Sequence, residues 1–92
     1  MSEDLDQWLV LIREAPSVED ARELLSLFMT IDELTEMDGR VRIIQALLEQ
    51  ELTQREMSSQ LGVSIAKITR GSNALKRCPN SLVHYLRRYF LG

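Results

Sequence analysis

The chain has 92 residues, of which 45% are apolar and 27% charged, the composition of one small soluble domain. Its longest apolar run, Trp8–Ile12, is five residues long, too short for a membrane span or for the core of a secretory signal. The single cysteine, Cys78, and the single histidine, His84, exclude an internal disulfide and a zinc site of the usual kind. We therefore expect a cytoplasmic protein.

The net charge of −3 conceals an asymmetry between the two parts of the chain. Residues 1–38 carry eleven acidic side chains against two arginines, a net charge of −9. Residues 39–92 carry three acidic side chains against nine basic ones, a net charge of +6. The basic second part favours a nucleic-acid partner, and an incidental distribution of surface charge is the alternative.

Apolar residues at helical spacing predict six helices and no strand, so the expected fold class is all-α. The predicted helices span about 3–15, 18–28, 31–50 and 80–91, with two short helices opening after residues 53 and 64. Pro16 is expected to end the first helix. Capping residues mark four of the later starts: Ser17, Thr30, Thr53 and Ser64.

The third predicted helix is the longest. Gly39 could bend it or split off its first turns, because glycine weakens a helix interior. After Gly39 the helix carries one apolar stripe, formed by Val41, Ile44, Leu47 and Leu48.

The run Trp8–Ile12 covers every side of a helix with apolar residues, so one domain core cannot bury all of it. The segments 27–29 and 89–91 pose the same problem. We therefore predict an obligate homodimer whose N-terminal helices lie in the shared interface, with a well-packed monomer as the alternative.

Residues 53–70 have the pattern of a helix-turn-helix. Small Ser58 would let the second helix pack across the first, and Gly62 can adopt the positive φ that ends the first helix tightly. The buried contacts are expected from Met57, Leu61, Val63, Ile65 and Ile68. The start of the second helix would then lie against base edges in the major groove. A helical hairpin that does not bind DNA is the alternative.

Arg70 is followed by Gly71 inside a predicted helix, which implies that another group approaches the backbone closely there. The segment Ile68-Thr69-Arg70-Gly71-Ser72-Asn73-Ala74-Leu75-Lys76, with Gly39–Ile44 and Thr53–Glu56 upstream, closely resembles the tryptophan repressor family. The resemblance aligns without gaps over about residues 27–76. It implies two interlocked chains that bind L-tryptophan as corepressor between the central core and each DNA-reading head.

The resemblance also implies which side chains hold the corepressor. Arg40 and Arg70 would stack on the two faces of the indole ring. Arg70 and the Thr30 hydroxyl would hold its carboxylate.

The remaining ligand contacts implied by the resemblance come from the backbone and from small or apolar residues. The carbonyl groups of Leu27 and Met29 would accept from the ammonium group at the C-terminal end of a helix, where the helix dipole favours a cation. Ile44 would line the pocket, Gly71 would leave room for the ring edge, and Ala74 stands where well-known members have serine.

On the DNA side, Arg55 resembles the residue that reaches a guanine edge. Ile65 and Ala66 match residues whose backbone contacts bases through water, and Gln54 and Thr69 match phosphate contacts. The implied DNA-binding set is Gln54, Arg55, Ser64, Ile65, Ala66, Lys67 and Thr69. A two-fold dimer implies a palindromic operator with half-sites about one helical turn apart.

The chain departs from the family pattern in places. Lys67 replaces a small polar residue near both ligand and DNA, and Ile31 replaces a proline. Neither removes a residue on which binding of the ligand or of DNA depends. We expect a single domain over 1–92, with a dimerisation core at about 1–50, the helix-turn-helix at 53–70 and a C-terminal helix at 80–91 that completes the core.

The sequence therefore predicts a transcriptional repressor that needs L-tryptophan to bind palindromic operators of tryptophan biosynthesis genes. The alternatives are a relative that responds to another indole or amino acid, one that binds DNA without a corepressor, and a helical adaptor that binds no DNA. An enzyme is not expected, because neither His84 nor Cys78 lies in a catalytic grouping. No cofactor or metal is expected.

Overall fold

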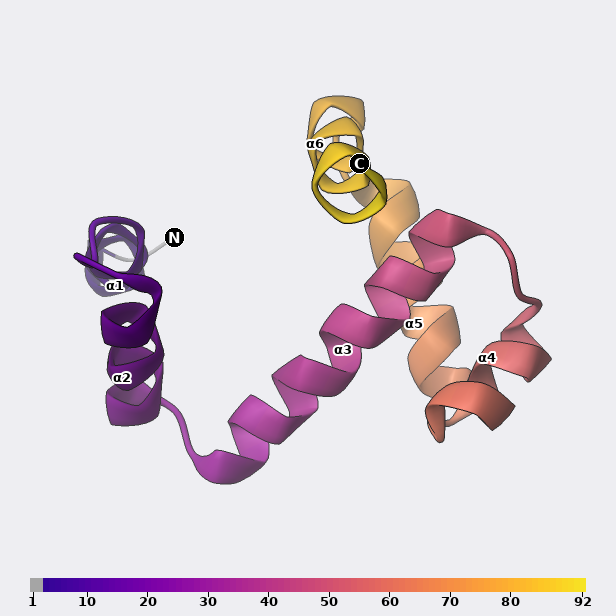
Figure 1. The fold of residues 1–92 in the computed structure, drawn as a ribbon, viewed down its shortest axis with the longest axis horizontal. Helices are drawn as coiled ribbons and strands as arrows, with labels where there is room; N and C mark the ends of the chain where they lie inside the picture. The colour runs from indigo at the N-terminus through magenta and orange to yellow at the C-terminus, as the bar shows by residue number, and fades with distance from the viewer. Residues whose placement is uncertain (1–2) are drawn as a thin grey trace. The chain divides into compact units, whose positions relative to one another are not determined.

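The computed structural model describes residues 3–92, and over that range it contains six helices and no strand (Figure 1). The prediction of an all-α chain is therefore confirmed. The helices are α1 Glu3–Arg13, α2 Val18–Phe28, α3 Ile31–Glu49, α4 Gln54–Leu61, α5 Ile65–Arg77 and α6 Asn80–Leu91. None of them is long and apolar enough to cross a membrane.

The starts of α2 and α3 are held by the predicted capping residues. The Asp20 amide donates to the Ser17 hydroxyl at 3.0 Å. At the start of α3, the Glu33 amide donates to the Thr30 hydroxyl at 3.1 Å and the Thr30 amide donates to the Glu33 carboxylate at 2.9 Å. These bonds satisfy amide groups that have no acceptor within the helix, which is why both starts follow from short-range sequence.

Two helix ends differ from the prediction. α1 ends at Arg13 rather than at Ala15. α3 ends at Glu49, because the next residue, Gln50, has a φ of 57° and lies in the left-handed region. That conformation costs a residue with a side chain about 1–2 kcal/mol, and it stops the helix one residue early. α3 runs unbroken through Gly39, so the predicted split does not occur.

The chain forms two compact units, one ending at Glu36 and the other running from Met37 to Gly92. In the first unit α1 packs against α2. No side chain of these two helices is fully buried, and Leu27 is 74% exposed. Among the described residues 3–92, the enclosed Trp8 indole N–H has no hydrogen-bond partner. The apolar run at Trp8–Ile12 therefore remains largely uncovered within this unit, as its pattern predicted.

The second unit has a small apolar core made by three helices. Its buried members are Ile43 and Ala46 from α3, Met57 from α4 and Ile68 from α5, and Ile68 is 0% exposed. Half-buried apolar side chains surround them: Leu47, Leu52, Leu61 and Val63.

One expectation about this core was wrong, and a second was right only in part. Ile65, predicted to be buried between the two helices, is 46% exposed. Of the stripe predicted on α3, Leu48 is buried and Leu47 packs against the core. Val41 is exposed, and the buried Ile43 and Ala46 were not predicted. The core-facing side of α3 is thus turned relative to the predicted stripe, because α4 and α5 both pack against it.

Candidate functional site

α4 begins and ends as the sequence predicted. Thr53 and Glu56 form a capping box, in which the Glu56 amide donates to the Thr53 hydroxyl at 3.1 Å and the Thr53 amide donates to the Glu56 carboxylate at 2.9 Å. Gly62 follows the helix with a φ of 66°, and its amide donates to the Ser58 carbonyl at 3.1 Å. The Ser58 hydroxyl donates to the carbonyl of Val63. These contacts turn the chain sharply from α4 toward α5.

α4 and α5 lie side by side beyond this turn. Met57 and Ile68 belong to the same buried core and join the two helices on their inner side. On the outer side, the Thr69 hydroxyl donates to the Gln54 side-chain oxygen at 3.3 Å. The structure therefore brings together two residues that the sequence placed 15 positions apart and that were both predicted to contact phosphates.

Ser64 caps the first turn of α5. The Lys67 amide donates to the Ser64 hydroxyl at 3.2 Å, and the Ile68 amide donates to the Ser64 carbonyl at 3.3 Å. The amides of Ile65 and Ala66 have no acceptor within the helix, because they belong to its first turn. All seven predicted DNA-binding side chains are exposed: Gln54, Arg55, Ser64, Ile65, Ala66, Lys67 and Thr69.

Gly71 is the point at which α5 approaches α3. A methyl group on Gly71 would lie 3.1 Å from Ile43 Cγ2, 3.4 Å from Leu47 Cδ1 and 3.8 Å from Ile44 Cδ1. The close approach that the Arg70–Gly71 pair predicted is thus made by α3 of the same unit. Ile43, which the sequence analysis did not single out, contacts this position more closely than Ile44 does.

Three of the predicted ligand residues belong to the first unit. Leu27 lies in the last turn of α2 and Met29 is its C-cap, so their carbonyl groups have no amide further along that helix to accept from. The Thr30 hydroxyl accepts from the Glu33 amide and keeps its own proton for donation. These groups suit a ligand with an ammonium group and a carboxylate.

The other predicted ligand residues belong to the second unit. Arg40, Arg70 and Ala74 are exposed, and Ile44 is half-buried. Arg70 and Ala74 lie one helical turn apart on α5, on either side of Gly71. The sandwich of the indole ring between Arg40 and Arg70 stays a prediction.

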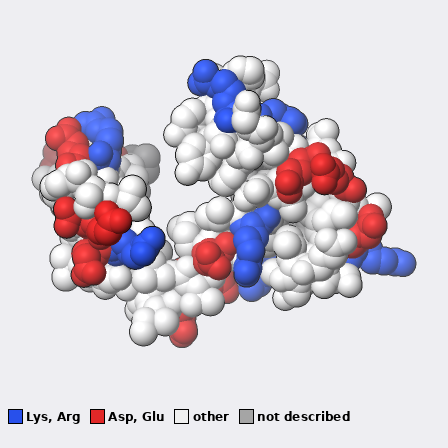
Figure 2. Space-filling view, viewed as in Figure 1, with Lys and Arg blue, Asp and Glu red and all other residues white. Residues whose placement is uncertain are grey.

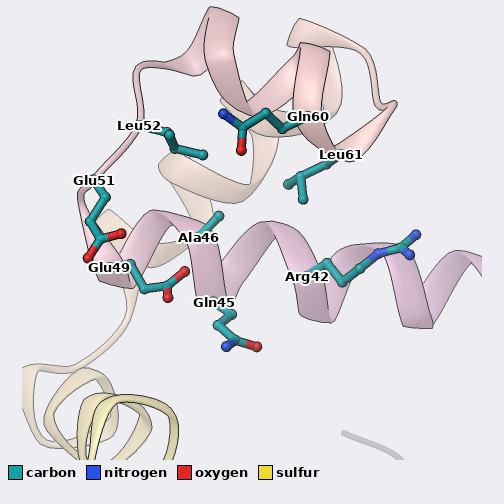
Figure 3. Close-up of a pocket in the computed structure, with 8 residues that line it drawn as sticks. All are labelled: Arg42, Gln45, Ala46, Glu49, Glu51, Leu52, Gln60 and Leu61. Atoms are coloured by element: carbon teal, nitrogen blue, oxygen red, sulfur yellow. The ribbon is translucent and has the colours of Figure 1, made fainter.

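Charge on the second unit is mixed. Figure 2 shows basic and acidic side chains interspersed on one face of the unit rather than one continuous basic patch. A hollow of about 360 Å³ lies between α3 and α4 of this unit (Figure 3). Its lining contains none of the predicted site residues: Arg42, Gln45, Ala46, Glu49, Glu51, Leu52, Gln60 and Leu61. Within residues 3–92, no group of three metal-ligating side chains comes together.

The capping box makes the stability of α4 depend on pH. Hydrogen bonds from the Thr53 backbone and hydroxyl to the Glu56 carboxylate lower the pKa of Glu56 from its usual value of 4.5. A carboxyl group with a lowered pKa in the folded state stabilises that state above its unfolded pKa, and the contribution disappears as the pH falls through the folded pKa.

We expect Glu56→Gln to lower the thermal midpoint at neutral pH, and we expect the difference from the unchanged protein to shrink below about pH 4. Glutamine keeps the reach of the side chain but does not titrate, so paired thermal melts across this pH range measure the carboxylate alone. A difference that stays constant from neutral to acid pH would contradict the role assigned to Glu56.

Comparisons with known proteins agree with the sequence pattern. The family described as Trp repressor protein matches residues 3–89. A Trp operon repressor homolog from Chlamydia trachomatis serovar D is 49% identical over 67 residues, which cover 73% of this chain and 71% of the relative. The protein of the same name from Chlamydia caviae is 42% identical over 80 residues, covering 87% of this chain and 79% of the relative. Its counterpart from Vibrio cholerae is 49% identical over 70 residues, which cover 76% of this chain and 68% of the relative.

Proposed function

This chain belongs to the Trp repressor protein family, and from that membership we propose that it is a transcriptional repressor controlled by L-tryptophan. As a homodimer in the cytoplasm it binds palindromic operators of tryptophan biosynthesis genes when tryptophan is bound. It is a regulator and not an enzyme. Tryptophan acts as an exchangeable ligand rather than as a cofactor.

The α4–α5 pair carries the proposal. It has the features of a helix-turn-helix: a tight turn at Gly62, a shared apolar core, and an exposed first turn on the second helix. Such a helix reads base edges from its N-terminal end. The amides of Ile65 and Ala66, which have no acceptor within the helix, support contacts to bases through water. The hydrogen-bonded pair Gln54 and Thr69 supports contacts to phosphates.

The exposed apolar side chains support the dimer. Leu9, Val10 and Leu11 of α1 are each 45–49% exposed, and Tyr89 of α6 is 73% exposed. A second chain that covers these side chains removes apolar surface from water, at roughly 25 cal/mol per Å². The single domain of residues 1–92 is then completed by the partner, with residues 1–50 and 80–91 in a shared core.

The proposed ligand contacts are those that the resemblance implies. The carbonyl groups of Leu27 and Met29 accept from the ammonium group, and the Thr30 hydroxyl and Arg70 hold the carboxylate. The planar guanidinium groups of Arg40 and Arg70 stack on the indole ring. The other contacts are made by Ile44, Gly71 and Ala74.

Tryptophan acts because its affinity differs between two states of the dimer. It binds more tightly when the two α4–α5 heads are spaced for adjacent major grooves, and so it raises the population of that state. Because the coupling is reciprocal, operator DNA must tighten tryptophan binding by the same factor.

The test is a gel-shift titration of an operator palindrome with and without saturating tryptophan, at two salt concentrations. We expect tryptophan to raise operator affinity by about 5- to 150-fold, and we expect affinity to fall steeply with salt because phosphate contacts release counterions. Operator affinity that tryptophan leaves unchanged would contradict the proposed regulation. The same titration with other indoles and amino acids distinguishes a relative with a different ligand, and the absence of any shift would favour an adaptor.

A further inference from the structure

The C-terminal end of α3 carries a concentration of negative charge. The helix dipole leaves partial negative charge on the last carbonyl groups, and the last turn of α3 contains no basic residue. It contains Glu49 instead, and Glu51 follows two residues later, so that both carboxylates lie at one end of the hollow in Figure 3. A positive charge from elsewhere in the fold would stabilise this helix end.

Arg87 of α6 supplies that charge. Its guanidinium Nη1 donates to the carbonyl oxygen of Leu48 at 3.4 Å, across 39 positions of sequence. Leu48 is 2% exposed, so its carbonyl group has little access to water, and Arg87 is itself half-buried. An enclosed carbonyl group in the last turn of a helix has no intrahelical donor, and a charged donor satisfies it well.

The bond between Arg87 and Leu48 holds the end of α3 from which the chain continues into the α4–α5 pair. Only residues 50–53 separate α3 from α4, and the first of them, Gln50, is held in the left-handed conformation with a φ of 57°. The direction in which α4 leaves α3 therefore depends on how firmly the last turn of α3 is held. A contact that secures this turn also limits the movement of the helices that follow it.

We propose that Arg87 is a positioning residue, which caps the C-terminus of α3 and thereby fixes the orientation of the α4–α5 pair relative to α3. The inference rests on the proposed function where DNA is concerned, since it makes α6 a determinant of operator affinity without touching DNA. The structural part of the inference, the anchoring of residues 50–53 by Arg87, is independent of what the protein binds.

The first test needs neither DNA nor tryptophan. Arg87→Gln is compared with Arg88→Gln, which removes the same charge from the next, exposed position of α6. We expect amide hydrogen exchange in residues 50–62 to rise several-fold in Arg87→Gln and to stay unchanged in Arg88→Gln. Equal exchange in the two variants would overturn the anchoring role.

The second test measures binding of the operator palindrome with saturating tryptophan, beside binding of a DNA of unrelated sequence. We expect Arg87→Gln to weaken operator binding about fivefold more than Arg88→Gln does, while both variants weaken nonspecific binding equally. Only operator binding requires both heads at a set spacing. Arg87→Lys keeps the charge and is expected to restore most of the affinity.

These experiments separate the two proposals. If the unchanged protein does not respond to operator and tryptophan, the proposed function fails, and hydrogen exchange still decides the role of Arg87. If operator binding depends on tryptophan but Arg87→Gln and Arg88→Gln lose the same affinity, the positioning role is wrong and the proposed function stands.

Discussion

Arg70→Gln is expected to weaken L-tryptophan binding by about 100-fold and to abolish the effect of tryptophan on operator affinity. Two contacts are lost together: the charged hydrogen bond to the carboxylate and the stacking of the guanidinium plane on the indole ring. Arg70 is exposed in this unit and lies one residue before the glycine at which α5 packs against α3. Its loss should therefore leave the fold intact. Titration calorimetry measures the ligand affinity directly.

Arg77→Gln is the matched control, since it removes the same charge from the exposed last turn of the same helix. We expect it to leave tryptophan affinity within about twofold, because exposed charges interact weakly at a distance. Arg70→Lys keeps the charge without the planar fork and should restore only part of the affinity. Unchanged tryptophan binding by Arg70→Gln would place the ligand elsewhere.

Ile68→Ala is expected to lower the free energy of unfolding by about 2–5 kcal/mol. Ile68 is 0% exposed and belongs to the core that α3, α4 and α5 share, so truncation removes apolar contacts and leaves a cavity among three helices. Chemical denaturation at one fixed protein concentration gives the value, because association with a second chain adds to the apparent stability.

Ile65→Ala makes the same chemical change three residues earlier on α5, at a side chain that is 46% exposed. We expect it to cost less than about 1 kcal/mol, since little cavity forms at the surface. Similar losses in the two variants would mean that the α4–α5 core does not carry the stability of this unit. Operator affinity of Ile65→Ala then reports separately on the exposed first turn of α5.

The sequence by itself predicted the helix starts, because the chemistry that sets them acts over a few residues. A hydroxyl at Ser17, Thr30, Thr53 or Ser64 accepts from an amide three positions later, and all four bonds are present. The positive φ of Gly62 was predictable for the same reason, since the turn that requires it is formed by residues adjacent in the sequence. The family assignment was accessible for a similar reason, because its motifs are contiguous in the chain.

Only the tertiary structure decided what each helix faces. Ile43 and Ala46 are buried because α4 and α5 pack against that side of α3, and no periodicity within α3 distinguishes this side from the stripe that was predicted. The close approach of the backbone at Gly71 to Ile43 and the bond from Arg87 to Leu48 join residues that are 28 and 39 positions apart. Such contacts depend on how whole helices meet. Local hydrogen bonds are determined by residues a few positions apart in the sequence. Packing between helices is determined by how their side chains fit together in the assembled core.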